Sequence, residues 1–143
     1  MTNQNPEQIA RDNIDKQLTA CGWIIQDIKH INLHCGIGIA VKEYLTDVGP
    51  ADYVLFIEGK PCGVIEAKRE DEGYRIETHE NQTEGYATAK LKHLKNEPLP
   101  FVYISTGEIT RSTDFTDPKP RARDVFTFQR PETLRTWLNK ANS

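Results

Sequence analysis

The spacing of apolar residues near the start of the chain predicts a helix over residues 6–20. Ile9, Ile14 and Leu18 recur near helical spacing there, a proline suits the first turn, and a Cys-Gly pair suits the stop. Extended segments are expected at 23–25 and 36–45, and the glycines of the second indicate a bend or a close neighbour. A loop is expected over 46–50.

The segment from Pro50 to Glu70 reads PADYVLFIEGKPCGVIEAKRE and predicts a β-hairpin. Two short runs rich in Val, Leu, Ile, Phe and Tyr are separated by Gly59-Lys60-Pro61, which is typical of two strands joined by a small loop. The rest of the predicted fold is organised around this hairpin.

The second half of the chain predicts two more helices and further strands. The predicted elements are a helix over 82–95, a strand over 101–105, a turn leading into an extended segment over 109–113, a short extended piece over 125–128 and a helix that begins at Pro131. The whole order predicts an α/β domain with a mixed central sheet flanked by helices. We expect one domain over 1–143, in which about 115–143 can serve as a linker and helix leading to further domains.

The composition fits a soluble globular protein of one core. The chain has 143 residues, 37% hydrophobic and 27% charged, and lacks the run of about 20 apolar residues that a membrane span needs. Its three cysteines are odd in number and have no CxxC spacing, and its first residues do not resemble a secretory signal. We therefore expect free thiols and a cytoplasmic location.

Charge is distributed unevenly along the chain. Residues 1–110 hold 11 Lys and Arg against 17 Asp and Glu, whereas residues 111–143 hold 7 against 4. A protein that binds DNA alone usually carries a broad basic face, which this sequence does not predict. The basic cluster over 119–123 fits either a linker or a phosphate contact.

Candidate catalytic residues lie at the start of the first strand of the hairpin and near the end of the second. Asp52 opens its first strand, and Glu66 and Lys68 lie near the end of the second. Because side chains alternate along a strand, Glu66 and Lys68 should share a face that Ala67 does not. The other E-x-K, at 58–60, falls on the loop. On this local pattern alone, a solvated strand end explains the residues as well as a site does.

These residue types suit metal-dependent hydrolysis of a phosphodiester. Mg²⁺ prefers a few oxygen ligands and keeps several waters, so Asp52, Glu66 and the backbone carbonyl of Ala67 can hold it beside a scissile phosphate. Lys68 can orient the attacking water or stabilise negative charge in the transition state.

The hairpin sequence resembles the core of PD-(D/E)xK nucleases, and most closely the N-terminal nuclease domain of type I restriction enzyme R subunits. The likeness extends over roughly residues 7 to 138. It departs at Pro50-Ala51-Asp52, where the proline is shifted by one residue. The other stretches that carry it are PEQIARDNIDKQLTACGW with Glu7, Arg11, Ile14 and Asp15, the Q-x-x-x-Y element of Gln82 and Tyr86, LPFVYISTGE and VFTFQRPETLRTWL.

The resemblance implies roles for several residues. Asp52, Glu66 and Lys68 would be catalytic, Gln82 and Tyr86 would support Lys68 or contact the DNA backbone, and Glu7 would be a third acid. From the residues alone, a polar helix surface with a half-buried tyrosine explains Gln82 and Tyr86 better than a site does, and Glu7 fits a helix-dipole partner.

The resemblance also implies a type I site-specific deoxyribonuclease, a Mg²⁺-dependent endonuclease that acts on double-stranded DNA with modification and specificity subunits. ATP would act only through motor domains, since G-x-x-x-x-G-K-[ST] does not occur in these residues. We expect the isolated domain to be weakly active or inactive. The alternatives are a PD-(D/E)xK repair nuclease or resolvase, and a non-catalytic DNA- or protein-binding module on the same fold.

The hairpin register decides whether the site can form. For Asp52 to share a face with Glu66 and Lys68, paired residues must have numbers that sum to an even value, as when Glu58 pairs with Cys62 across a three-residue loop. A two-residue loop gives an odd sum and the wrong face unless a bulge intervenes.

Overall fold

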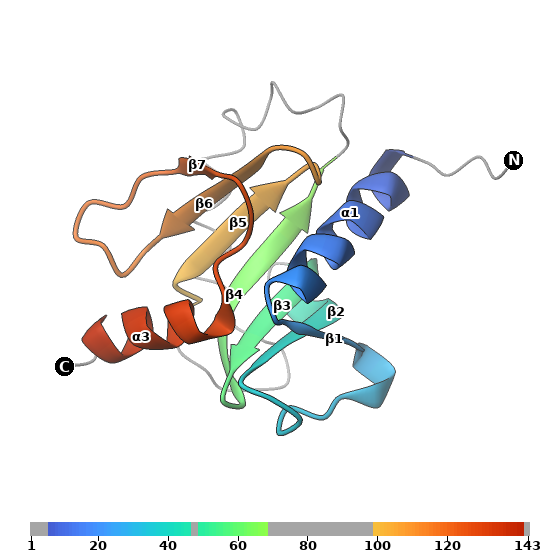
Figure 1. Cartoon of the computed structure of the whole chain (residues 1–143), viewed down its shortest axis with the longest axis horizontal. Helices are drawn as coiled ribbons and strands as arrows, with labels where there is room; N and C mark the ends of the chain where they lie inside the picture. The colour runs from blue at the N-terminus through green and yellow to red at the C-terminus, as the bar shows by residue number, and fades with distance from the viewer. Residues whose placement is uncertain (1–5, 47–48, 69–98, 142–143) are drawn as a thin grey trace, which may run out of the picture.

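In the computed structural model, the described part of the chain comprises residues 6–46, 49–68 and 99–141, and it forms one seven-stranded sheet with two α-helices (Figure 1). The strands follow one another across the sheet in the order of the sequence. The elements are α1 (Pro6–Ala20), β1 (Ile24–Asp27), a short 3₁₀ helix η1 (Ile28–His30), β2 (Gly38–Thr46), β3 (Gly49–Ile57), β4 (Lys60–Ala67), β5 (Phe101–Ser105), β6 (Thr110–Asp114), β7 (Arg123–Val125) and α3 (Pro131–Ala141).

The sheet is mixed, which confirms the predicted fold class. Strands β1 and β2 are parallel, as are β4 and β5, and the other neighbours are antiparallel. The helix predicted over 82–95 lies outside the described residues. No helix in the described part of the chain has the length and apolar character needed to cross a membrane.

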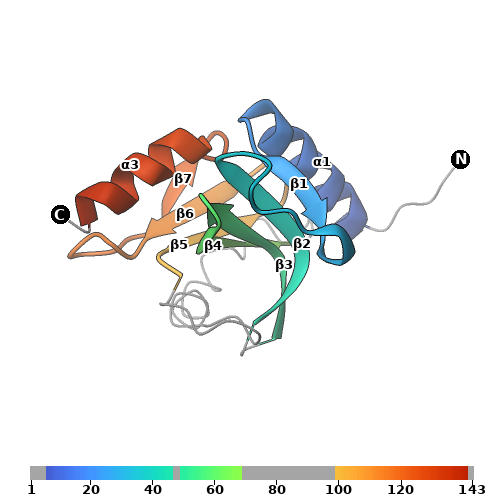
Figure 2. The ribbon, with the colours of Figure 1, turned by 90° about the horizontal axis from the view of Figure 1, so that it is seen from below.

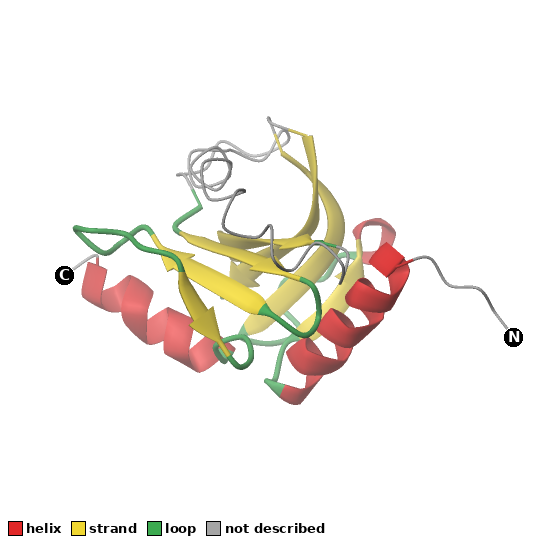
Figure 3. Cartoon of the chain, turned by 90° about the horizontal axis from the view of Figure 1, so that it is seen from above, coloured by secondary structure: helices red, strands yellow, loops and turns green. Residues whose placement is uncertain are grey.

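Helices α1 and α3 cover the same face of the sheet (Figures 2 and 3). Their apolar residues pack with one face of the central strands into a first core cluster, and the opposite face of the strands forms a second. The first includes Ile14, Leu18, Tyr53, Leu55, Ile65, Tyr103, Phe128 and Leu134; the second includes Ile39, Val41, Val54, Phe56, Val64, Leu99 and Val102.

The glycines of the predicted strand indicated a close neighbour, and Gly38 has one. A Cβ atom at this position would lie 2.4 Å from Cγ of Pro131 and 2.9 Å from Cε3 of Trp23. The start of α3 therefore packs directly on the backbone of β2, because glycine leaves room for it.

The hairpin loop is shorter than predicted. Ile57 pairs with Lys60, so the loop is Glu58-Gly59 and not Gly59-Lys60-Pro61. Both loop residues have positive φ, 51° and 82°, which is the backbone of a type I′ turn, the usual two-residue connection between antiparallel strands.

A β-bulge corrects the register that this loop sets. Pairing is Phe56 with Pro61 beside the loop but Leu55 with Gly63 one step further, so Cys62 is the extra residue. Beyond the bulge the numbers of paired residues sum to an even value, as the site requires. The three-residue loop was the wrong route to this register, and the bulge supplies it instead.

Two other boundaries differ from the prediction. The loop expected over 46–50 is too long, because β2 continues to Thr46 and β3 begins at Gly49. The extended piece expected over 125–128 is displaced, since β7 ends at Val125, where pairing with Thr110 ends. Phe128 is instead buried in the first core cluster.

Candidate active site

Asp52 reaches across the hairpin to the end of β4. Its Oδ2 atom accepts a 2.7 Å hydrogen bond from the backbone N–H of Ala67, which is the amide that joins Glu66 to Ala67. The Asp52 side chain is 13% exposed, so this carboxylate is largely shielded from water. The structure thus joins the predicted acid of the first strand to the predicted E-x-K of the second.

Glu66 and Lys68 form a partly buried ion pair. Nζ of Lys68 lies 3.8 Å from Oε1 of Glu66, and the two side chains are 19% and 20% exposed. The backbone N–H of Lys68 also donates a 2.7 Å hydrogen bond to the carbonyl of Ser105, which fixes the chain just beyond the end of β4. This pair is better shielded than a solvated strand end would be.

Arg11 on α1 forms an ion pair with Asp52, and the sequence did not predict this contact. Its Nη2 atom donates a hydrogen bond to Oδ1 of Asp52, and its Nη1 atom lies 3.3 Å from Oε1 of Glu43 on β2. Burial lowers the pKa of Arg11, but the charge of Asp52, the hydrogen bond to it and the charge of Glu43 outweigh this, so the pKa is raised overall. Arg11 therefore stays positively charged beside Asp52.

The backbone opposite Asp52 is irregular. Glu43 has φ of 56°, a left-handed conformation that is uncommon for a residue with a side chain, and the Glu43–Asp52 step is missing from a ladder that pairs Lys42 with Tyr53 and Tyr44 with Ala51. Asp52, opposite this break, contacts both α1 and β4. Strained backbone of this kind often marks a functional site.

A second polar network anchors α1 on the sheet beside Arg11. The hydroxyl of Tyr53 donates a 2.6 Å hydrogen bond to Oδ1 of Asp15, and Nζ of Lys42 lies 2.6 Å from Oδ2 of the same carboxylate. The Tyr53 hydroxyl is also 3.1 Å from the carbonyl oxygen of Arg11. Burial raises the pKa of Tyr53, and the hydrogen bond to Asp15 raises it further. The backbone that carries Arg11 is therefore held in place.

Comparison with known proteins gives the family. A model of the N terminus of the type I restriction enzyme R protein matches residues 39–121, more than half of the chain. The chain belongs to this family. A similar solved structure is a fragment assigned to an HsdR subunit of a type I restriction enzyme from Vibrio vulnificus YJ016, with a TM-score of 0.60 and 20% sequence identity. The similarity covers 96% of this chain and 26% of that one, and no curated protein matches the sequence.

The donor set of this R-protein N-terminal domain suits Mg²⁺ better than a softer metal. Within the described residues, no cluster of three or more His, Cys, Asp and Glu side chains is arranged to hold a metal, so the candidate side-chain ligands are the two carboxylates alone. Asp52, Glu66 and the Ala67 carbonyl would supply only hard oxygen ligands and leave several positions for water, which is how Mg²⁺ is usually bound. Gln82, Tyr86 and the side chain of Glu7 lie outside the described residues.

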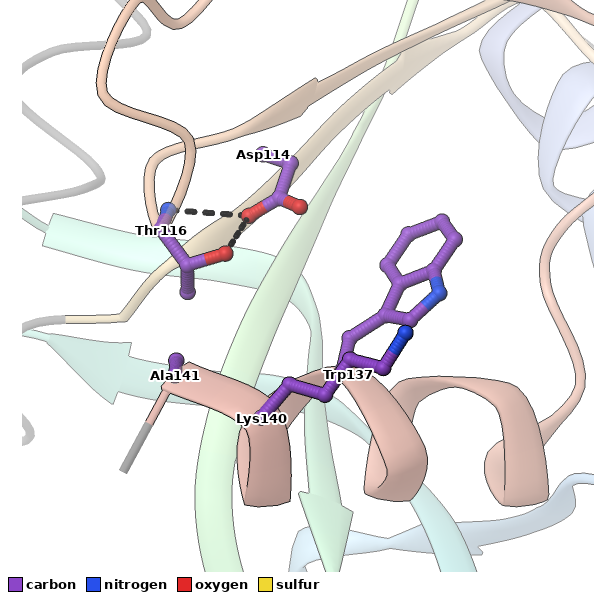
Figure 4. A pocket seen from close by; sticks show the side chains of 5 residues that line it. All are labelled: Asp114, Thr116, Trp137, Lys140 and Ala141. Atoms are coloured by element: carbon purple, nitrogen blue, oxygen red, sulfur yellow. Dashed lines mark hydrogen bonds between the residues drawn. The ribbon is translucent and has the colours of Figure 1, made fainter. Parts of the chain in front are cut away.

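A pocket elsewhere on this R-protein N-terminal domain is separate from these residues. It has a volume of about 320 Å³ and lies between the end of β6 and α3 (Figure 4). Asp114, at the end of β6, pairs with Phe101 at the start of β5, whereas Ala67 pairs with Ser105 at its end. The pocket therefore lies at the opposite end of these strands from the candidate site. Its lining residues are Asp114, Thr116, Trp137, Lys140 and Ala141.

Proposed function

We propose that this chain is the Mg²⁺-dependent endonuclease domain of a type I restriction R subunit, which hydrolyses phosphodiester bonds in double-stranded DNA. The observation that carries the proposal is the hydrogen bond from the Glu66–Ala67 amide to Asp52, beside the Glu66–Lys68 ion pair. Family membership supports this function over a repair nuclease or resolvase.

The residues divide the chemistry between them. Asp52, Glu66 and the Ala67 carbonyl would hold Mg²⁺, which when bound polarises a phosphoryl oxygen and lowers the pKa of bound water. Lys68 would orient the attacking water or neutralise charge as it develops on the phosphate. Its ammonium is already held near Glu66, so little reorganisation is needed before the reaction.

The proposed setting is a larger assembly. The chain corresponds to 26% of the HsdR fragment it resembles, and we propose that motor domains driven by ATP, together with modification and specificity subunits, deliver the DNA. The excess of acidic residues over 1–110 supports this arrangement, because the domain then need not hold DNA by itself.

Plasmid cleavage by the reconstituted complex with Mg²⁺ and ATP tests the function. Asp52→Ala and Lys68→Ala should each reduce cleavage at least about a hundredfold, as expected when a metal ligand or a group that stabilises transition-state charge is removed. ATP hydrolysis should be retained.

The other E-x-K of the chain offers matched controls. Glu58 and Lys60 are exposed at the hairpin loop, so Glu58→Ala and Lys60→Ala remove the same charges without touching the site. These variants should cleave like the wild type. Full cleavage by Asp52→Ala or Lys68→Ala would show that the proposed mechanism is wrong.

A further inference from the structure

Both oxygens of the Asp52 carboxylate already have partners within the protein. Oδ2 accepts a hydrogen bond from the Ala67 amide, and Oδ1 is paired with the guanidinium of Arg11. The amide is part of the sheet and stays in place, whereas the arginine carries a full positive charge. A cation that binds Oδ1 would therefore lie beside the positive charge of Arg11, which opposes its binding.

Arg11 has a second carboxylate available to it. Its Nη1 atom lies 3.3 Å from Oε1 of Glu43, whose side chain is 66% exposed. Its buried Nε atom has no hydrogen-bond partner in the described part of the chain, so the guanidinium is held through its terminal nitrogens. The side chain can turn from Asp52 toward Glu43 without breaking a bond at Nε.

The surrounding structure limits the movement to this side chain. Asp15 binds both Tyr53 and Lys42, and the Tyr53 hydroxyl also approaches the carbonyl of Arg11. These contacts hold the backbone of α1 against β2 and β3. The guanidinium bridges the two carboxylates in this structure, with Nη2 on Asp52 and Nη1 on Glu43, so it can leave Asp52 while it keeps its contact with Glu43.

We propose that Arg11 is a built-in counter-ion of the candidate metal site. It neutralises Asp52 while the site is empty, and its guanidinium moves to Glu43 when a divalent cation binds. The inference rests on the proposed function, because it requires a cation at Asp52. Arg11 is a positioning residue that orients Asp52, and its positive charge weakens the affinity for metal. The left-handed backbone of Glu43 supplies the second acceptor at the right place.

Calorimetric titration of the folded chain with Mn²⁺, and then with Mg²⁺, tests the inference without measuring cleavage. Arg11→Met and Arg11→Gln remove the competing charge and should bind Mn²⁺ at least about tenfold more tightly. Arg11→Lys retains the charge and should bind like the wild type. Circular dichroism verifies that each variant is folded, and the two neutral variants serve as alternatives if one is unstable.

Glu43→Gln tests the second half of the movement. Without its second acceptor Arg11 stays on Asp52, so this variant should bind Mn²⁺ more weakly than the wild type. In the Arg11→Met background the same substitution should weaken Mn²⁺ binding much less, because no guanidinium is then present to pair with Glu43. Equal effects in both backgrounds would contradict transfer.

The outcomes separate this inference from the proposed function. If Asp52→Asn abolishes Mn²⁺ binding but both neutral Arg11 variants bind no more tightly than the wild type, the counter-ion role is wrong and the metal site stands. If the wild type does not bind Mn²⁺, or Asp52→Asn binds it equally well, the metal site and the counter-ion role are both wrong.

Discussion

Asp52 and Ala67 are 15 residues apart in the sequence, yet the amide of Ala67 donates a 2.7 Å hydrogen bond to the Asp52 carboxylate. This contact depends on the single extra residue at Cys62, which changes the pairing from Phe56–Pro61 to Leu55–Gly63. Without the bulge, the two-residue loop would place Glu66 and Lys68 on the other face of the strand. The loop and the bulge together determine the register at the candidate site.

A substitution in the hairpin loop should stabilise the fold without changing the candidate site. Glu58 has φ of 51° in a type I′ turn, where asparagine is favoured, so Glu58→Asn should raise the free energy of unfolding by about 0.5–1 kcal/mol. Urea unfolding measures this. Gly59→Val, which places a branched side chain at φ of 82°, should lower the stability by more than this gain. A destabilising Glu58→Asn would contradict the assigned turn.

Gly63 should not tolerate a side chain. A Cβ atom there would lie 2.9 Å from the carbonyl oxygen of Phe101 on the neighbouring strand, so Gly63→Ala should cost about 1–3 kcal/mol in unfolding free energy. Gly36→Ala is the control, because its Cβ would meet the end of the flexible Ile24 side chain. Equal stabilities for the two variants would show that β4 and β5 are not packed as described.

Stability should decrease at alkaline pH. Burial raises the pKa of Tyr53, Tyr103 and Cys62 above their ordinary values, which are about 10 for tyrosine and 8.5 for cysteine. Below about pH 8 the folded and the unfolded chain both keep these protons, so the three groups do not lower the free energy of unfolding there. Above that pH the unfolded chain releases protons that the folded chain retains, so the free energy of unfolding falls, by up to about 1.4 kcal/mol per pH unit for each group.

Urea unfolding between pH 8 and pH 11 measures this decrease. The double variant Tyr53→Phe, Cys62→Ala should show a shallower decline than the wild type, although it is less stable at pH 8. An equally steep decline would mean that these groups do not retain their protons in the folded state.

The chain alone should bind DNA weakly and only at low salt. Residues 1–110 carry six more acidic than basic side chains, so few phosphates can be neutralised, and we expect dissociation constants of about 10⁻⁴ M or weaker at physiological salt. Fluorescence anisotropy with a labelled duplex measures this. Submicromolar binding that resists salt would contradict a domain that depends on other parts of an assembly.

The local elements were predictable where periodicity and a stop signal agreed. The helix predicted over 6–20 is α1, and the strand predicted over 101–105 is β5. The loop was wrong because Gly59 and Pro61 suggested a longer turn, and nothing in a glutamate at 58 indicates left-handed backbone. The sequence predicted that an even register was needed, but not that a bulge at Cys62 would supply it.

The contacts of Arg11 were beyond what spacing can predict. Arg11 and Asp52 are distant in the sequence, and they meet only because α1 packs over β3 through Tyr53 and Asp15. The same applies to Glu43, whose role depends on the broken ladder opposite Asp52. Such interactions follow from tertiary packing and leave no mark in local periodicity.

Anomalous diffraction from crystals of the chain grown with Mn²⁺ tests the central claim most directly. We expect one strong peak at about 2.1 Å from oxygens of Asp52 and Glu66, the distance typical of small divalent cations with hard ligands. Asp52→Asn crystals should lose it. A peak bound elsewhere, or none at Mn²⁺ concentrations that support cleavage by the assembled complex, would contradict the proposal that these two carboxylates form the metal site.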